Sequence, residues 1–460
     1  MGKNSIKYYS TNREAPKVSF GEALLKGLAP DGGLYMPDII PSLNKADIEN
    51  LFSLDYPHVA YRILNSFLSG EIESDKLLEL CLDAYNFDIP IEKIFDRTYI
   101  LRLDQGPTLS FKDFAARMMA RLMSYYISIE NRHFTILTAT SGDTGSAVAN
   151  AFYGIENIDV IVLFPAEEIT DYQRKQMTTL NKNINAVAIN GKFDDCQRLV
   201  KKAFLDQSLS ECCLSSANSI NVGRLLPQSV YYFYSWSRIA ANTDEAVIFS
   251  VPSGNYGNLM GGILARNMGL PVKKFIISAN ENDEVPKYLQ SGIYNIIDPS
   301  INCISSAMNV GHPSNMARII ALYGGMMNRE GEIKERPDFN GIIKDFAGYS
   351  ITDEETRETI AAFYENYERI IEPHGAVAWR GMEMFREEYE SFETDSPLYV
   401  SLETAHPSKF REEIVKILGI SPDIPVQLSR IENIEENYTE LENDYSELRN
   451  FILKHKNNTR

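Results

Sequence analysis

The chain of 460 residues carries 45 basic and 63 acidic side chains, a formal net charge of −18, and is 44% hydrophobic and 23% charged. This composition is ordinary for a folded protein of two or three packed domains, and the acidic balance argues against nucleic acid and acidic membranes as partners. No window approaches twenty uninterrupted apolar residues, and the N-terminus lacks the apolar segment of a secretory signal, so we expect neither a membrane span nor secretion.

The first 95 residues are predicted to form a mostly helical N-terminal domain. Apolar residues recur at helical spacing over 46–69 and 71–86. Between the N-terminus and these segments, the run GLAPDGGLYMP at 27–37 is punctuated by proline and glycine, which predicts a loop.

From residue 97 onward, short β-branched runs alternate with helical segments. This alternation predicts mainly parallel sheets that are covered by helices on both faces. The predicted strands are RTYILRL (97–103), FTILTA (134–139), IDVIVLFP (158–165), INAVAING (184–191), AVIFSV (246–251), KKFIISAN (273–280) and PLYVSLE (397–403). The predicted helices cover 110–129, 145–154, 225–240, 258–269, 355–367 and 373–390.

These elements predict an α/β protein with two doubly wound domains after the N-terminal domain. We place the boundaries of the small α/β domain at 96–213 and those of the large domain at 214–460. The large domain ends in a charged tail, where EENYTELENDYSEL (435–448) predicts a solvated helix. In such sheets ligands bind at the carboxyl ends of strands, where loops open helices.

One such loop, PSGNYGN at 252–258, lies between a predicted strand and a predicted helix. Gly254 and Gly257 have no Cβ, so backbone N–H groups can close around an oxyanion there. The helix N-terminus behind the loop adds its dipole, and together they make a plausible phosphate cradle. The same glycines also suit a tight turn without a ligand, and no Walker motif follows.

A second loop, TATSGDTGSA at 138–147, also follows a strand and opens a helix. Ser141, Thr144 and the N–H groups near Gly142 and Gly145 offer several donors at one point. Asp143 adds negative charge, so we expect it to cap the helix or to orient a neighbouring donor. Two donor-rich loops predict a ligand with two anionic ends.

Lys112 lies near the start of the long helix predicted from Ser110, beside Phe111 and Phe114. A lysine flanked by aromatic rings near a helix N-terminus can be partly desolvated, which lowers the pKa of its ammonium group. A Schiff-base lysine needs such an environment. Taken alone, the pattern favours a surface lysine whose alkyl chain covers apolar neighbours.

A third group of donors lies in SSANSINVGRLLPQ at 215–228. Ser219, Asn221 and Arg224 occur within six residues, and the planar guanidinium suits an oxyanion. The alternative is a capped helix start with a surface arginine.

Near the end of the chain, SLETAHPSKF at 401–410 places Glu403, Thr404 and His406 just past a predicted strand. His406 and His374 are the histidines expected to be functional, with a structural role as the alternative. The histidines have no partners at metal-ligand spacing, and the five cysteines have no CxxC spacing, so we predict no metal and reduced thiols of a cytoplasmic protein.

Together these segments resemble threonine synthase, in the fungal and enterobacterial-type branch of that family. The resemblance runs in the family's order from residue 7 to about residue 410. The segments that carry it are KYYSTN (7–12), GLAPDGGLYMP, GPTLSFKDF (106–114), TSGDTGSA, NSINVGRLLPQ, PSGNYGN, SAMNVGHPSN (306–315), EPHGAVA (372–378) and ETAHPSKF.

The resemblance implies the pyridoxal-phosphate fold of the tryptophan synthase β-subunit and the conversion of O-phospho-L-homoserine and water to L-threonine and phosphate. Residue by residue, it implies that Lys112 forms the Schiff base with the cofactor and moves protons. It implies further roles for three groups of residues: cofactor-phosphate binding by Gly254, Asn255, Tyr256 and Gly257, with Thr404 at the pyridine nitrogen; substrate-carboxylate binding by Ser141, Gly142, Asp143, Thr144 and Gly145; and substrate-phosphate binding by Ser219, Asn221 and Arg224, with Lys409 and Asn315 as further candidates.

Three alternatives stay open at this point. A related pyridoxal-phosphate phospho-lyase or a hydroxyamino-acid dehydratase would share the fold and the lysine, although Arg224 with Ser219 and Asn221 suits a phosphorylated substrate better. A non-catalytic ligand-binding scaffold is the third. The expected partners are a small-molecule substrate and, as oligomeric state, a monomer or a homodimer, without nucleic acid or membrane.

Overall fold

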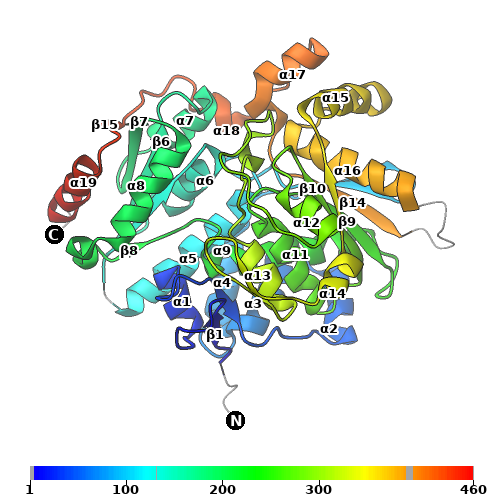
Figure 1. Ribbon diagram of the computed structural model, residues 1–460, viewed down its shortest axis with the longest axis horizontal. Helices are drawn as coiled ribbons and strands as arrows, with labels where there is room; N and C mark the ends of the chain where they lie inside the picture. The colour runs from blue at the N-terminus through cyan, green and yellow to red at the C-terminus, as the bar shows by residue number, and fades with distance from the viewer. Residues whose placement is uncertain (1–4, 131, 390–396, 459–460) are drawn as a thin grey trace.

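The computed structural model describes residues 5–130, 132–389 and 397–458. Two sheets organise these residues into neighbouring α/β layers, with the N-terminal segment packed below both (Figure 1). No helix among the described residues is long and apolar enough to cross a membrane. The predicted α/β fold with a mostly helical N-terminal region is therefore confirmed.

The first sheet has five parallel strands in the order β15-β7-β6-β5-β8. Both of its faces are buried, because Ile161 and Leu163 of β6 pack into one core while Val160 and Val162 pack into another. Its strands are β5 (Phe134–Ala139), β6 (Ile158–Pro165), β7 (Ile184–Asn190), β8 (Leu214–Ser215) and β15 (Thr439–Glu442). The helices around it are α5 (Lys112–Glu130), α6 (Asp143–Phe152), α7 (Asp171–Thr178), α8 (Phe193–Leu205) and α19 (Tyr445–Asn458).

The second sheet has six strands in the order β13-β10-β9-β14-β4-β3, of which only the β3–β4 pair is antiparallel. Phe249 and Ile248 of β9 again face different cores. Its strands are β3 (Ile91–Phe95), β4 (Thr98–Arg102), β9 (Val247–Pro252), β10 (Val272–Ala279), β13 (Phe346–Ser350) and β14 (Leu398–Glu403). The helices between residues 222 and 429 are α9 (Val222–Leu225), α10 (Val230–Ile239), α11 (Gly257–Asn267), α12 (Glu284–Ser291), α13 (Met316–Leu322), α14 (Phe339–Asp345), α15 (Asp353–Tyr367), α16 (Pro373–Tyr389), α17 (Arg411–Leu418) and α18 (Val426–Ser429).

The N-terminal segment is helical where the sequence predicts helices, but it is more finely divided. Asp55 caps α3 by accepting the N–H of His58, and Pro57 lies in the first turn, where its missing N–H costs nothing. These two residues split the predicted helix at 46–69. The elements are β1 (Tyr8–Ser10), α1 (Phe20–Lys26), β2 (Tyr35–Pro37), α2 (Lys45–Asn50), α3 (Tyr56–Leu68) and α4 (Ser74–Ala84), followed later by the hairpin β11 (Met326–Met327) and β12 (Ile333–Glu335).

The two sheets do not take their strands in simple chain order. β3 and β4, at 91–102, join the sheet that is otherwise built from residues after 246, and β15 returns to the five-stranded sheet. The domain limits 1–95, 96–213 and 214–460 therefore stay a prediction, and the sheets cross them.

The helix predicted over 435–448 is wrong for its first part. Residues Thr439–Glu442 form β15, and the helix begins only at Tyr445. The free edge of β7 offers unpaired backbone groups, and parallel pairing to them outweighs the local helical pattern. In Figure 1 the terminal helix, α19, lies beside α8. Its residues Leu448 and Ile452 belong to the same hydrophobic core as the buried residues of α8.

A short pairing between distant segments places Lys112. Ser110 and Ala405 form an isolated antiparallel bridge, and the N–H of Phe111 donates to the carbonyl of Thr404 at 2.8 Å. Because Ser110 takes part in this bridge and Phe111 lies in a turn, α5 begins at Lys112 rather than at Ser110. The end of β14 therefore lies beside the start of α5.

Candidate active site

A cavity of about 1880 Å³ opens between the two sheets and the N-terminal segment. Loops at the carboxyl ends of β5, β9 and β14 line it, as parallel sheets require. The sequence-predicted residues that line it are Lys112, Ser141, Asp143, Thr144, Ser219, Arg224, Gly254, Asn255, Tyr256, Gly257, His374 and Thr404. Segments that lie far apart in the chain thus meet with the lysine in one cavity.

Lys112 projects from the first turn of α5, and its side chain is 12% exposed. Its Nζ lies 5.2 Å from the centroid of the Phe111 ring. Burial lowers the pKa of the Lys112 ammonium and the cations Lys409 and Arg224 lower it further, whereas the carboxylate of Asp143 opposes them. The result is an amine that loses its proton more readily than an exposed lysine does.

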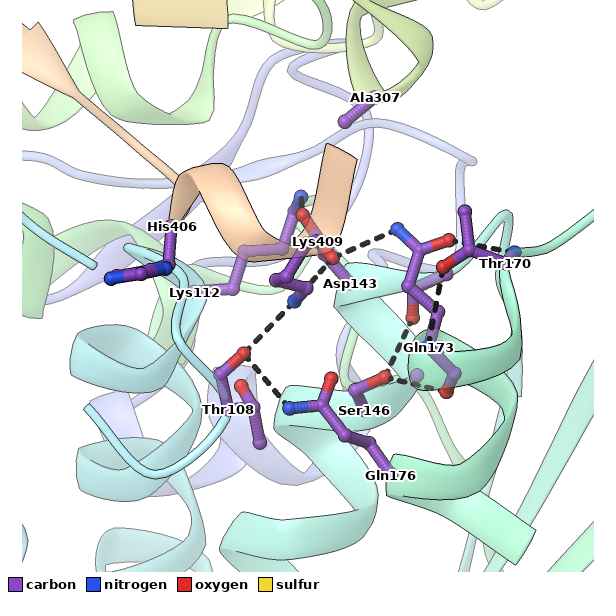
Figure 2. Close-up of polar contacts among 12 residues, drawn as sticks. Thr108, Lys112, Asp143, Ser146, Thr170, Gln173, Gln176, Ala307, His406 and Lys409 are labelled. Atoms are coloured by element: carbon purple, nitrogen blue, oxygen red, sulfur yellow. Dashed lines mark hydrogen bonds and ion pairs between the residues drawn. The ribbon is translucent and has the colours of Figure 1, made fainter. Parts of the chain in front are cut away.

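Asp143 holds two lysines around one carboxylate (Figure 2). Its Oδ1 pairs with Lys409 Nζ at 2.6 Å and its Oδ2 lies 3.7 Å from Lys112 Nζ. Gln173 Nε2 donates to Oδ1 at 3.0 Å. Burial alone would raise the pKa of Asp143, but the two lysines and these hydrogen bonds hold it well below its ordinary value. Asp143 is therefore a fixed anion beside the amine of Lys112.

Lys409 does not line the cavity. Its side chain is fully buried, and Nζ donates to the carbonyl of Thr108 at 2.9 Å in addition to pairing with Asp143. The resemblance implies that it is a candidate contact of the substrate phosphate. Its position instead makes it the counter-ion of Asp143.

The glycines of the 141–145 loop serve its conformation. The N–H groups of Gly142 and Gly145 both donate to Thr140 Oγ1, at 2.9 and 2.8 Å. Gly142 has φ +139, and a Cβ on Gly145 would lie 2.4 Å from Thr140 Cγ2. Ser141 and Thr144 are the predicted donors of this loop that line the cavity, whereas the N–H groups of Gly142 and Gly145 are used inside the loop.

The 253–257 loop is held close to a neighbouring segment. A Cβ on Gly254 would lie 2.8 Å from Met308 Cα, and Tyr256 has φ +60 just before α11 begins at Gly257. Asn255 Oδ1 accepts from the N–H and the hydroxyl of Ser314 at 2.7 and 2.9 Å. Glycine, tight packing and an eleven-residue helix behind the loop fit a phosphate group.

Thr404 lies at the cavity wall above a buried carboxylate. Its Oγ1 lies 3.5 Å from Glu372 Oε1, which also accepts the N–H of Gly375 at 3.1 Å. His374 Nδ1 contacts Glu372 Oε2 at 2.5 Å, and His374 Nε2 accepts the N–H of Ala307 at 3.1 Å. These contacts fix a neutral tautomer with the proton on Nδ1.

Two further predicted residues have structural partners. Asn221 is fully buried, donates to the carbonyls of Leu24 and Ser216, and accepts from the N–H of Gly223, so its side chain caps α9 instead of facing the cavity. His406 Nδ1 contacts the hydroxyl of Ser408 at 2.8 Å, and burial lowers the pKa of His406 to about 4.

Arg224 lines the cavity and has a donor without a hydrogen-bond partner in the described part of the chain. Nη1 donates to the carbonyl of Ala217 at 2.8 Å, but the buried Nε has no acceptor among the described residues. Burial lowers the pKa of Arg224 to about 10, which still leaves it a cation near neutral pH. A buried guanidinium with a free donor fits an anion that binds beside Ser219.

A group of potential metal ligands lies outside the residues that line the cavity. Among the described residues, Glu281, Cys303 and Asp353 bring potential ligand atoms within 4.8 Å of one another. The N–H of Ile304 donates to the Asp353 carboxylate at 3.0 Å, and burial raises the pKa of Cys303 to about 11. We assign no ion to these three residues.

The sequence did not point to Gln173, Glu372 and Arg318. Their side chains form hydrogen bonds with Asp143, Thr404 and the carbonyl of Ser219, respectively. Glu372 lies within the quoted segment EPHGAVA and could have been noticed there. Gln173 and Arg318 reach the site only through tertiary contacts, which no local pattern reveals.

Comparisons with known proteins agree along the whole chain. Three family models match it: Threonine synthase N terminus over residues 7–85, Pyridoxal-phosphate dependent enzyme over 91–393, and Threonine synthase, C-terminal over 376–452. The threonine synthase of Haemophilus influenzae is 39% identical over 98% of this chain and 100% of its own length. Pyridoxal-phosphate-bound threonine synthase from Brucella melitensis has a TM-score of 0.91 at 35% identity, and the yeast enzyme 0.89 at 31%, each over 98% of this chain and 99% of that one.

Replacing Asp143 tests the electrostatics of the site. Asp143→Asn removes the negative charge beside Lys112, so the pKa of Lys112 should fall further. The measurement is the pH dependence of amine labelling of Lys112 in the apoprotein, followed by mass spectrometry of its peptide. Asp159→Asn, at a carboxylate that pairs with His133 instead, is the control and should not move the labelling midpoint. An unchanged or raised labelling midpoint in Asp143→Asn would contradict the conclusion that the Asp143 carboxylate stabilises the ammonium form of Lys112.

Proposed function

The chain belongs to the threonine synthase family of pyridoxal-phosphate-dependent lyases, and on this premise we propose that its cavity converts O-phospho-L-homoserine and water to L-threonine and phosphate. The observation that carries the proposal is Lys112, which lies in one cavity with a phosphate-type loop at 253–257 and a second cationic pocket at Arg224. We extend the proposal to a cytoplasmic location, which the five free cysteines support. A monomer or homodimer stays a prediction.

The residues divide the binding work among them. The backbone of Gly254, Asn255, Tyr256 and Gly257 would hold the cofactor phosphate at the start of α11, and Lys112 Nζ would hold its aldehyde carbon. Thr404 would meet the pyridine nitrogen. When bound, the cofactor supplies an electron sink for the carbanion that forms at the substrate Cα.

Lys112 is proposed to carry protons between carbon atoms. Once the substrate amine has replaced it, its freed Nζ would take the proton from Cα, release that proton to the cofactor, and then take a second proton from Cβ. As phosphate leaves Cγ, Nζ would deliver this second proton to Cγ. Water would then add its hydroxyl to Cβ, a proton would return to Cα, and the remaining proton of the water would leave with the phosphate. The lowered pKa of Lys112 suits its role as a base, and Asp143 stabilises the ammonium that forms at each step.

The substrate would bind through both of its anionic ends. Ser141 and Thr144 would bind the carboxylate, together with the helix N-terminus of α6. Gly142, Asp143 and Gly145 stay part of the proposal as the residues that shape this loop. Ser219 and Arg224 would bind the phosphate, with Asn221 holding the turn between them.

Arg224 also separates this function from the alternatives. Serine and threonine, the substrates of the dehydratases, have no group that would use a buried guanidinium with a free Nε. A phospho-lyase would use the same pocket, so only the product distinguishes it from a threonine synthase. A scaffold without catalysis would not need the lysine and its paired carboxylate.

The products of the reaction test the proposal directly. The holoprotein, incubated with O-phospho-L-homoserine, should release L-threonine and phosphate in equal amounts, as measured by amino-acid chromatography and a phosphate assay. Lys112→Ala should lower kcat by several orders of magnitude, because the Cα proton then has no acceptor, while the fold stays intact. Release of phosphate together with a keto acid and no threonine would identify a phospho-lyase instead.

The phosphate pocket is tested separately through KM. Arg224→Ala removes a charge-assisted hydrogen bond worth about 1.5–3 kcal/mol, so kcat/KM should fall about 10- to 100-fold, mainly through KM. Arg224→Lys keeps the charge without the planar fork and should lie between the two. Wild-type kinetics in Arg224→Ala would remove this residue from the pocket.

A further inference from the structure

Arg318, on α13, is a fully buried arginine whose guanidinium meets only neutral acceptors. Nη1 donates to the carbonyl of Ser219 at 3.0 Å and to Asn315 Oδ1 at 2.6 Å. Nη2 donates to the carbonyl of Ile220 at 2.7 Å and to that of Tyr35 at 3.1 Å, which also accepts from Nε. All the donors of the guanidinium are therefore used.

The charge of Arg318 has no opposite charge in contact with it. Within residues 5–130, 132–389 and 397–458, no carboxylate pairs with its guanidinium, and burial lowers the pKa of Arg318 to about 9. It remains a cation near neutral pH. Taking an unpaired cation out of water is unfavourable, so such a charge needs a compensating partner.

The residues that Arg318 contacts connect it to two anion pockets: the cofactor-phosphate loop at 253–257, and a second pocket formed by Ser219 and Arg224. The carbonyls that it holds belong to Ser219 and Ile220, which line the cavity at the second pocket. Because a peptide unit is planar, fixing the Ser219 carbonyl also turns the following N–H away from the guanidinium. The orientation of this backbone thus depends on Arg318.

The second route runs through Asn315. Its Oδ1 accepts from Arg318, which leaves Nδ2 to donate to the carbonyl of Asn255 at 2.8 Å. Asn255 Nδ2 in turn contacts Ser219 Oγ at 2.5 Å. A Cβ on Gly257 would lie 3.3 Å from Ser219 Cβ, so the cofactor loop and the second pocket touch. Arg318 is therefore connected by hydrogen bonds to the cofactor loop and to the second pocket.

We propose that Arg318 is the positioning residue for both anion pockets, and that phosphate bound in front of it balances its buried charge. Arg318 itself does not line the cavity, so it acts through Ser219, Ile220 and Asn315 and through its field. The assignment of the two pockets to the cofactor and the substrate rests on the proposed function. The effect of Arg318 on anion binding can be measured without turnover, so it is tested separately from the proposed function.

The test compares Arg318→Met and Arg318→Lys with Arg117→Met. Arg117 is also a buried arginine, whose guanidinium donates to the carbonyls of Ala84 and Asp83 and to Asn86 outside the cavity lining, so it controls for loss of a buried arginine. Each full-length apoprotein is titrated with pyridoxal phosphate, followed by absorbance, and each holoprotein with inorganic phosphate, followed by the shift in Tm.

We expect Arg318→Met to bind pyridoxal phosphate at least about tenfold more weakly and to lose most of the Tm shift caused by inorganic phosphate. Arg318→Lys should lie between Arg318→Met and wild type, because it keeps the charge but reaches fewer carbonyls. Arg117→Met should have a lower Tm and wild-type affinities for both anions.

Wild-type affinities in folded Arg318→Met would overturn the proposal, as would an equal loss of affinity in Arg117→Met. Where Arg318→Met does not fold, Arg318→Lys decides, and wild-type affinity for both anions in that variant contradicts the positioning role. A wild-type protein that binds both anions but makes no threonine would overturn the proposed function and leave the role of Arg318 intact.

Discussion

The carboxylate of Asp143 between two buried lysines is the interaction on which the site depends. Lys112 must be buried enough to lose its proton easily, yet a buried amine also needs a partner whenever it is charged. Asp143 is that partner, and it stays ionised because Lys409 pairs with its other oxygen. Without Lys409, burial would favour protonated Asp143, and the charge beside Lys112 would disappear.

The fold supplies this arrangement by bringing strand ends together from distant parts of the chain. β5 ends at the loop that contains Asp143, β9 ends at the phosphate-type loop, and β14 ends at Thr404. The bridge between Ser110 and Ala405 then connects the start of α5 to the end of β14. The site therefore forms only when both sheets are complete.

The sequence predicted what depends on short patterns. The strands around 134–139 and 247–252, the two glycine loops and Lys112 all follow from local spacing, and resemblance assigned their roles. What it missed depends on long-range contacts. β15 pairs with the edge of β7, some 250 residues earlier in the chain, and overrides a local helical pattern. The resemblance implies Lys409 as a candidate contact of the substrate phosphate, and the structure makes it the partner of Asp143. Arg318 gave no local signal because most of its acceptors come from two distant segments, at Tyr35 and at Ser219–Ile220.

Chemical trapping of the cofactor on one lysine tests the central claim most directly. The holoprotein should be yellow, and borohydride should bleach it and attach the cofactor covalently to a single peptide, identified by mass spectrometry as the one that contains Lys112. Modification of a different lysine would contradict the account. A protein that stays colourless and unmodified with added pyridoxal phosphate would contradict it as well.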